Sequence, residues 1–192
     1  MEYLTVGLIS YLMGSIPFGL ILTKFFLNKD IRDIGSGNIG ATNVLRTGNK
    51  LIAYSTLILD IIKAIIPVIY IKINFPELIY IASLSAFLGH VFPVWLRFKG
   101  GKGVATYVGI LFSINIILGI VFVACWGLIF LIFRYSSLSS IVGSLSIPIY
   151  ILMIGQTNSV IFFGIMFILI FYTHRENIKR LKNKEESKTK IY

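Results

Sequence analysis

Acidic residues, cysteines and histidines are scarce in this chain. Its 192 residues include 8 Asp and Glu against 18 Lys and Arg, and they contain one cysteine and two histidines. A single cysteine, Cys125, excludes an intramolecular disulfide and a thiolate metal site. His90 and His174 lie far apart without zinc-like spacing, so the sequence predicts neither a metal site nor a cofactor.

Apolar residues, by contrast, are abundant. They make up 56% of the chain, and the mean hydropathy is +0.86, far too high for a soluble domain of this length. These values are typical of a multi-spanning membrane protein built as one helical bundle. The net charge of +10 would suggest nucleic acid in a soluble protein. In a membrane protein the positive charge instead indicates how the chain is oriented in the bilayer, so no nucleic-acid partner is expected.

The apolar residues fall into segments long enough to cross a bilayer. The first has Glu2 before it and no cleavage site after it, so a retained helix is expected instead of a signal peptide. Pro17 in that segment can kink it. The segments are Tyr3–Leu27, Leu51–Ile71, Pro76 to about Val94, Val104–Phe133, Ser137 to about Ile154 and Ser159–Thr173.

The segment Val104–Phe133 is too long for one crossing, since about thirty residues make roughly 45 Å of helix against a hydrocarbon core of about 30 Å. If it crosses twice, all Lys and Arg except Lys63 and Lys72 fall on one face, as the positive-inside rule favours. We therefore expect an all-α integral membrane protein, a seven-transmembrane helical bundle with one short or broken helix after Gly100–Gly103. The short piece would run to about Phe112 and continue as buried, non-regular chain.

Two ionisable residues, Asp60 and Lys63, interrupt the second segment. They are i,i+3 neighbours on one helical face, and charged groups at membrane depth normally face a partner or an aqueous cavity. A structural ion pair and a direct functional role are both compatible with this pattern.

Glycines cluster with a lysine in the stretch from Gly89 to Thr106, which reads Gly-His-Val-Phe-Pro-Val-Trp-Leu-Arg-Phe-Lys-Gly-Gly-Lys-Gly-Val-Ala-Thr. Glycines let backbone N–H groups approach an oxyanion, Lys102 adds a charge, and a helix starting at Val104 would aim its dipole there. The pattern predicts a phosphate site; an ordinary cationic loop is the alternative. It is no P-loop, because Leu96 replaces the first glycine.

A second glycine cluster, Gly35-Ser-Gly-Asn-Ile-Gly40, matches a dinucleotide fingerprint only formally, because membrane segments flank it where a βαβ unit would be required. Its glycines, with the side chains of Ser36, Asn38, Thr42 and Asn43 and the following Arg46, can still form an anion cradle. In the tail, His174, Asn177 and Arg180 share one helical face, although basic tails often only meet anionic lipid. Ser137 and Ser140 are similarly spaced, or simply cap a helix.

Three blocks of this sequence resemble the signature blocks of one family. They are Gly35-Ser-Gly-Asn-Ile-Gly-Ala-Thr-Asn43, Gly89-His-Val-Phe-Pro93 with Phe98-Lys-Gly-Gly-Lys-Gly-Val-Ala-Thr106, and His174-Arg-Glu-Asn-Ile-Lys-Arg-Leu181. The chain looks like a bacterial membrane-integral glycerol-3-phosphate acyltransferase that uses acyl phosphate, and the resemblance covers essentially its whole length. One departure is Lys184, where the family usually has glycine; Glu186 fits the pattern.

The resemblance implies transfer of a fatty acyl group from acyl phosphate to the sn-1 hydroxyl of glycerol 3-phosphate, the first acylation of phospholipid biosynthesis. Lysophosphatidic acid and inorganic phosphate would be released. The acyltransferases that use thioesters rely on a histidine with an aspartate five residues on. Here those places hold Trp95 and Lys179. We expect direct transfer, with no acyl-enzyme, in which a donor phosphate oxygen takes the hydroxyl proton.

The expected site residues divide into two groups. One of them, His90, can instead be a buried residue that only fixes the conformation of its loop. The expected catalytic residues are Lys102, Arg46, Ser36, Asn38, His174 and Asn177. The expected substrate-binding residues are Gly35, Gly37, Thr42, Asn43, His90, Gly100, Gly101, Gly103, Thr106, Ser137, Ser140 and Arg180.

The expected setting is the bacterial cytoplasmic (inner) membrane, with the N-terminus outside and the active site facing the cytoplasm. Residues 1–192 would form a single acyltransferase domain with a flexible tail from about residue 183. Acyl phosphate, glycerol 3-phosphate and the lipid bilayer are the expected partners, together with the enzyme that makes acyl phosphate. The alternative class is a small transporter or flippase for phosphorylated solutes, which would use the same cradles without chemistry.

Overall fold

The computed structural model describes residues 1–189, and within this range every regular element is a helix. The last three residues of the expected flexible tail, 190–192, lie outside the described part. Among the described residues five helical segments are long and apolar enough to cross a membrane, or six when one bent pair is counted as a span. The expectation of an all-α membrane protein is therefore confirmed, whereas the count of seven crossings stays a prediction.

The chain divides into two compact units, Met1–Ile114 and Asn115–Tyr192. In the first unit the opening apolar segment forms two helices, α1 (Glu2–Gly14) and α2 (Phe18–Leu27). Pro17 stands directly before α2 and has no N–H to continue the α1 hydrogen-bond ladder. The expected kink at Pro17 is thus a full break.

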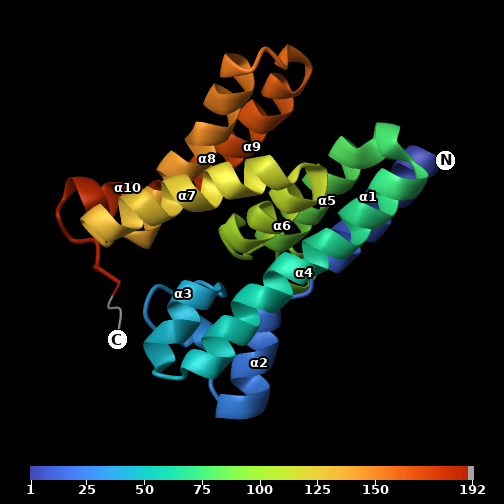
Figure 1. Ribbon diagram of the computed structural model, residues 1–192. Coiled ribbons are helices and arrows are strands. Elements are labelled where there is room, and N and C mark those ends of the chain that lie inside the picture. Colours follow the sequence, from blue (N-terminus) through green and yellow to red (C-terminus); the bar gives the residue numbers. More distant parts are fainter. Residues whose placement is uncertain (190–192) are drawn as a thin grey trace. The chain divides into compact units, whose positions relative to one another are not determined.

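The longest helix of the first unit is α4 (Lys50–Asn74), which begins where the Asn49 side chain accepts a hydrogen bond from Ile52 N at 3.1 Å. After the short turn η3 (Pro76–Leu78), α5 (Ile79–Val91) packs along α1. Helix α6 (Val104–Ile114) packs along α4 (Figure 1).

Helix α6 lies beside the second half of α4 and runs in the same direction. Near its start Thr106 Oγ1 lies 3.5 Å from Asp60 O. At its end Lys72 Nζ donates to Ser113 O and Ile114 O, each at 2.9 Å. The helix therefore begins midway along α4, which places the preceding glycine loop at the depth of Asp60.

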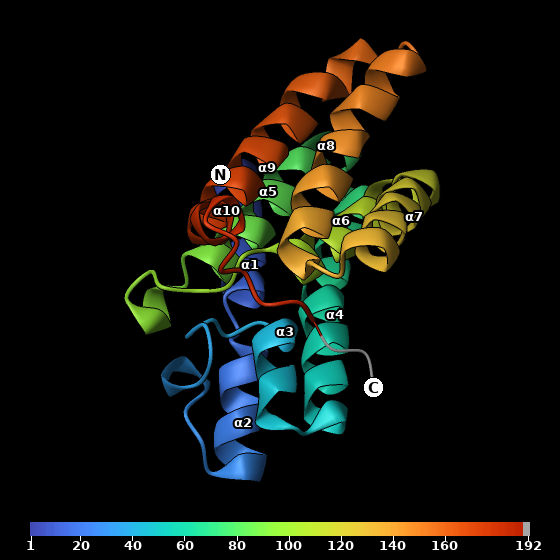
Figure 2. The ribbon, with the colours of Figure 1, turned by 90° about the vertical axis from the view of Figure 1, so that its left-hand side faces the viewer.

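A small subdomain precedes α4 and carries the first glycine cluster. It consists of η1 (Ile31–Asp33), α3 (Ala41–Val44) and η2 (Leu45–Thr47). Helices α2 and α3 lie beside the first turns of α4 (Figure 2). They enclose an apolar core of Leu20, Ile31, Ile39, Val44, Ile52 and Ala53.

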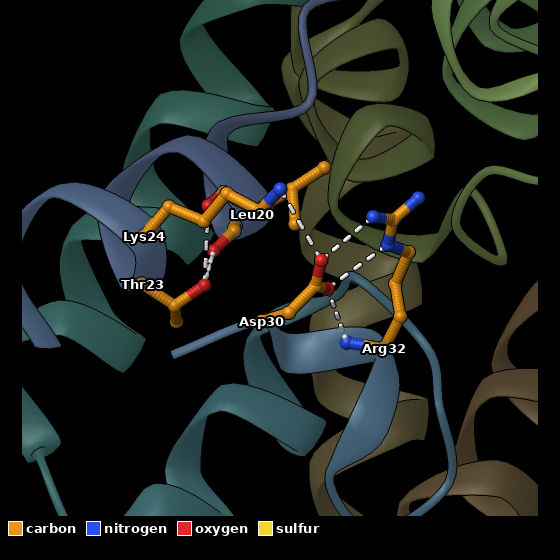
Figure 3. Close-up of polar contacts among 6 residues, drawn as sticks. Leu20, Thr23, Lys24, Asp30 and Arg32 are labelled. Carbon is orange, nitrogen blue, oxygen red and sulfur yellow. Dashed lines mark hydrogen bonds and ion pairs between the residues drawn. The ribbon is translucent and has the colours of Figure 1, made fainter. Parts of the chain in front are cut away.

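The turn after α2 is held by an ion pair drawn in Figure 3. The Asp30 carboxylate accepts from Arg32 Nε at 2.9 Å and Nη2 at 2.6 Å, and Lys24 Nζ lies 3.3 Å away. The hydrogen bond from Arg32 holds the pKa of Asp30 well below its ordinary value. Because both cations are about half exposed, this pair fixes the turn more than it stabilises the fold.

The second unit is a helical hairpin with a helix before it and a short helix after it. Helix α7 (Ile116–Phe133) packs on α8 (Ser136–Met153), which packs on α9 (Val160–Thr173) after the turn η5 (Thr157–Ser159). Helix α10 (Arg175–Lys182) follows at a bend of 60°. The prediction that the tail begins as a helix is confirmed.

The segment 104–133 is divided, as its length predicted, but the form of the division differs from expectation. No non-regular chain follows the short helix, because α6 continues to Ile114. Asn115 is then extended, and its side chain accepts from Ile117 N at 2.8 Å. A single capping residue therefore both ends α6 and starts α7.

Candidate functional site

The second glycine block forms a loop that folds back onto the end of α5. After the turn η4 (Val94–Leu96), Arg97 and Phe98 both take positive φ values, 50° and 62°. The chain then returns so that Gly100 N donates to Val91 O and Gly101 N donates to His90 O, each at 3.0 Å. The loop is thereby fixed by backbone contacts to one helix end.

Side chains at Gly101 and Gly103 would not fit this loop. A Cβ on Gly101 would overlap His90 Nε2, and one on Gly103 would overlap the Phe87 ring. Gly103 also has φ +86°, which other residues rarely adopt. The glycines therefore let the loop pack closely against α5.

The N–H groups of Gly100 and Gly101 were expected to donate hydrogen bonds to phosphate. They donate instead to backbone carbonyls of α5. The first-turn N–H groups of α6, which begins at Val104, have no preceding turn to bond to and are the better anion donors. Lys102 lies just before this turn and is partly exposed. Thr106 is fully buried toward Asp60 and does not lie at the surface of the loop.

The first glycine block is organised around the buried Asn43. Its Nδ2 donates to Ile31 O, Ile34 O and Asn38 O at 2.8–3.1 Å, while its Oδ1 accepts from Ser36 N at 3.0 Å. These contacts occupy the whole amide, so Asn43 shapes the loop from within.

Other residues of the same block lie at the surface. Ser36, Gly37, Thr42 and Arg46 are exposed. A Cβ placed on Gly35 would lie 2.8 Å from Arg46 Cδ, so the arginine passes directly over this glycine. The Asn38 side chain accepts from Gly40 N at 2.9 Å and is partly buried. The block therefore offers hydroxyl and guanidinium groups around a glycine turn, which suits an anion.

Three buried ionisable residues meet beneath the second loop. Lys63 Nζ lies 2.8 Å from Asp60 Oδ1, 2.9 Å from His90 Nδ1 and 2.7 Å from Ile16 O. The three side chains are 2–3% exposed. The sequence left open whether Asp60 and Lys63 face a partner or an aqueous cavity. In the structure they are partners in an ion pair inside the first unit.

The second unit holds a polar cluster centred on Glu186. Its carboxylate accepts from Ser137 Oγ at 2.7 Å, Asn177 Nδ2 at 2.6 Å and Arg180 Nε at 2.7 Å. Burial opposes ionisation of this carboxyl, but the three hydrogen bonds outweigh it and hold its pKa below the ordinary value. The structure thus joins three of the predicted residues through a fourth that the site prediction left out.

His174 and Ser140 are both buried in this unit. His174 Nδ1 lies 2.8 Å from Ile170 O, and since a carbonyl only accepts, Nδ1 carries the proton. Ser140 Oγ donates to Ser136 O at 2.8 Å and accepts from Trp126 Nε1 at 3.2 Å, so it connects α8 to α7. Asn177 Oδ1, in contrast, is buried without a partner among residues 1–189.

The backbone at Lys184 explains why the signature block usually has glycine there. Lys184 has φ +59°, a conformation that costs a non-glycine residue about 1–2 kcal/mol. This reversal after α10 turns the chain so that Glu186 reaches Ser137 and Asn177. The fit of Glu186 to the family pattern was the one sequence signal for its role.

These features define a helical membrane protein whose polar loops carry anion-binding groups. The comparisons with known proteins agree with this description. The family model described as glycerol-3-phosphate acyltransferase matches residues 4–184. The chain therefore belongs to the glycerol-3-phosphate acyltransferase family.

Individual relatives are similar over all or nearly all of their length. A glycerol-3-phosphate acyltransferase of Pelagibacter ubique (strain HTCC1062) is 73% identical over all of both chains. One from Bradyrhizobium diazoefficiens is 50% identical over 97% of this chain and 95% of its own. The crystal structure of PlsY (YgiH), an integral membrane glycerol 3-phosphate acyltransferase in its glycerol 3-phosphate form, has a TM-score of 0.91 at 36% identity. The match covers 98% of this chain and 96% of that one.

Membership of this family decides between the two classes that the sequence left open. The protein is a membrane-integral acyltransferase of phospholipid synthesis that acts on glycerol 3-phosphate. The transporter alternative is not needed to account for its anion-binding loops.

Proposed function

We propose that the acyl donor is acyl phosphate and that the acceptor is the sn-1 hydroxyl of glycerol 3-phosphate. In this reaction the hydroxyl oxygen bonds to the acyl carbon, and the bond between that carbon and the phosphate oxygen breaks. The hydroxyl proton passes to a phosphate oxygen of the donor. The products are 1-acyl-glycerol 3-phosphate, which is lysophosphatidic acid, and inorganic phosphate, and no acyl-enzyme forms.

The environment of the two histidines carries this proposal. His90 Nδ1 contacts Lys63, its ring packs on Gly101, and Asp60 is 3.8 Å away and pairs with Lys63. His174 Nδ1 donates to a backbone carbonyl. At neither histidine is the Nδ1 atom hydrogen-bonded to a carboxylate, as it is in a histidine activated as a general base. Acyl phosphate, an activated mixed anhydride, suits an enzyme that binds and orients its substrates instead.

Phosphate binding in the first unit is assigned to Lys102, Arg46 and the N-terminal turn of α6. Ser36, Thr42 and Asn38 position the donor beside Arg46, while Asn43, Thr106 and the loop glycines shape the loops. A cation and helix N–H groups together favour phosphate dianions and the oxyanion that develops during transfer.

Orientation of glycerol 3-phosphate is assigned to His174, Asn177 and Ser137 of the second unit. Glu186 takes the Nδ2 group of Asn177, which leaves the buried Oδ1 as an acceptor. An acceptor without a partner suits a hydroxyl donor, so we assign it to a glycerol hydroxyl. Ser140 is assigned to helix packing.

The apolar pocket of the first unit is not assigned to the acyl chain. Its volume is about 490 Å³, and its lining includes Val6, Ile9, Ile66, Ile71 and Phe75. These residues lie on α1, on the last part of α4 and directly after it, away from the loop that precedes α4. Such a pocket suits a lipid tail of the surrounding bilayer better than a reacting chain.

Donor competition tests the proposal. Purified protein in detergent would receive glycerol 3-phosphate with acyl phosphate, acyl-CoA or acyl carrier protein thioester, and lysophosphatidic acid and free phosphate would be measured. We expect turnover with acyl phosphate alone and stoichiometric phosphate release. Comparable turnover with a thioester would overturn the donor assignment, and an acyl group bound to quenched enzyme would overturn direct transfer.

A further inference from the structure

Lys63 connects three separate segments of the first unit. Its ammonium group donates to Ile16 O at 2.7 Å and contacts His90 Nδ1 at 2.9 Å, and it forms an ion pair with Asp60, whose Oδ1 lies 2.8 Å away. Ile16 belongs to the break between α1 and α2, Asp60 to α4, and His90 to the end of α5. One buried side chain therefore fixes the relative positions of these segments.

Two of these segments, the break at Ile16 and the end of α5, contact a glycine loop. Three residues after Ile16, Gly19 packs so closely that a Cβ would overlap Ile39 O of the first loop. On the other side, His90 O accepts from Gly101 N, and the His90 ring occupies the space where a Gly101 side chain would lie. The contacts of Lys63 thus extend to the second loop directly through His90, and to the first loop through Gly19, three residues after Ile16.

A purely stabilising role explains this arrangement poorly. A buried ion pair is often no better for stability than well-packed apolar residues of similar size, because desolvation offsets the attraction. The apolar alternative is easy to reach in a membrane helix. What an apolar cluster cannot supply is a set of directed hydrogen bonds that fixes backbone positions to a few tenths of an ångström.

We propose that Asp60, Lys63 and His90 are positioning residues that set the placement of the two glycine loops relative to each other. This inference rests on the proposed role of those loops, which is phosphate binding by Arg46, Lys102 and the first turn of α6. Acyl transfer requires the acyl carbon and the hydroxyl at a fixed separation. A shift of one loop by about 1 Å can cost as much as 100-fold in rate without removing a single substrate contact.

The test replaces the ion pair as a unit. The variant Asp60→Leu/Lys63→Met removes both charges and keeps the volumes, so the protein should fold with a thermal midpoint near that of the parent. We expect kcat to fall about 10- to 100-fold, with KM for glycerol 3-phosphate changing less. Lys72→Met is the matched control, because it removes two hydrogen bonds from the other end of α4. It should leave kcat and KM within about twofold of the parent values.

A distance measurement makes the test independent of activity. Spin labels at the exposed Lys29 and Lys99, in a Cys125→Ser background, report the separation of the segments that carry the two loops. We expect a broadened or displaced distance distribution in Asp60→Leu/Lys63→Met and an unchanged one in Lys72→Met and Lys102→Ala. If Lys102→Ala keeps full activity, the assignment of phosphate binding to Lys102 fails. The positioning role is then decided by the double variant alone.

Two results would overturn the inference. One is a folded double variant with parental kcat, KM and distance distribution. The other is loss of activity in the double variant with the distance distribution unchanged, which would assign the cluster a different role. If the double variant does not fold, His90→Asn provides the second case, because it removes the ring that packs on Gly101 and leaves the Asp60–Lys63 pair intact. It too must change the distance distribution.

Discussion

Single residues of the glycine loops differ sharply in what they contribute. Lys99 and Lys102 lie three positions apart on one connection, and both add positive charge beside the membrane. Lys99 is exposed, whereas Lys102 lies between Gly101 and Gly103 and directly before the first turn of α6. Only Lys102 is close to the place where helix N–H groups converge.

Lys102→Ala should therefore nearly abolish turnover, while Lys99→Ala should reduce it only slightly. A charge-assisted contact that tightens in the transition state is worth about 3–4 kcal/mol, or two to three orders of magnitude in rate. An exposed lysine near headgroups matters by about 1 kcal/mol or less. Initial rates at equal amounts of folded protein decide this. Equal losses in the two variants would mean that the loop is only a cationic surface.

Glu186 should make the stability of the second unit depend on pH in the acidic range. Its folded-state pKa lies below the ordinary value of 4.5, so its contribution is fully present above that value. It is lost as the pH falls through the folded-state pKa. Glu186→Gln should remove this dependence, lowering stability near neutral pH and flattening its change below pH 4.5. Thermal unfolding of both proteins as a function of pH measures it, and parallel curves would contradict it.

Lys184→Gly should be neutral or stabilising, which is unusual for a substitution to glycine. The native φ of +59° is strained for lysine and free for glycine, which offsets the larger entropy of the unfolded glycine chain. We expect a change in unfolding free energy of between zero and about 1 kcal/mol in favour of the variant. Lys182→Gly, inside α10, is the control and should destabilise the protein.

At the scale of helices, α1 and α5 are held together by backbone contact. A Cβ on Gly14 would overlap Ala86 O, and one on Gly89 would overlap Tyr11 O. Small residues at such crossings let transmembrane helices approach closely and gain packing energy. The close approach also brings Tyr11 Oη within 2.6 Å of Phe92 O, at the start of the connection that carries Lys102.

Gly14→Ala should consequently separate the two helices, whereas Gly7→Ala on the same helix should not. At Gly7 an added Cβ would meet Ser85 Oγ at 3.5 Å, an ordinary contact. Overpacking at Gly14 should cost about 1–3 kcal/mol, and alanine at Gly7 should be neutral or favourable because of its higher helix propensity. The melting temperatures in detergent give the comparison, and equal melting temperatures would refute the packing argument.

Hydropathy predicted the helices because a membrane span must be apolar over its whole length. The length of segment 104–133 and the basic residues around it predicted a division, which was placed at about Phe112 and lies at Asn115. Other features depend on contacts between distant residues. Lys63 meets Ile16 and His90 at separations of 47 and 27 residues. Glu186 reaches Ser137 across 49 residues. The same limit applies to Asn43, whose residue type suggested a ligand-binding amide although its neighbours use it entirely.

At the scale of the whole molecule, the number of crossings decides where the two ends of the chain lie. Six crossings would place both termini on one side, and five or seven would place them on opposite sides. An α6 of 11 residues spans only about 16 Å, about half of a bilayer core of about 30 Å. Its length alone argues against a crossing.

The packing of α6 against α4 resolves this difficulty. Because α6 starts at the level of Asp60 and ends at the level of Lys72, it covers the second half of the α4 span. We expect the connection from Val91 to Gly103 to account for the other half. We expect the two together to make one full crossing, which would leave the basic segments 28–50, 97–102, 134 and 175–188 on one side, as the positive-inside rule favours.

We therefore expect the N-terminus outside and the C-terminus in the cytoplasm. Single cysteines at Thr5 and Ser187, in a Cys125→Ser background, would be treated with a membrane-impermeant maleimide in intact cells and in inverted vesicles. Thr5→Cys should react only in cells and Ser187→Cys only in inverted vesicles. Reaction of both from the same side would remove the odd number of crossings. It would also mean that one of the two shorter candidates, α6 or the bent pair of α9 and α10, is not a span.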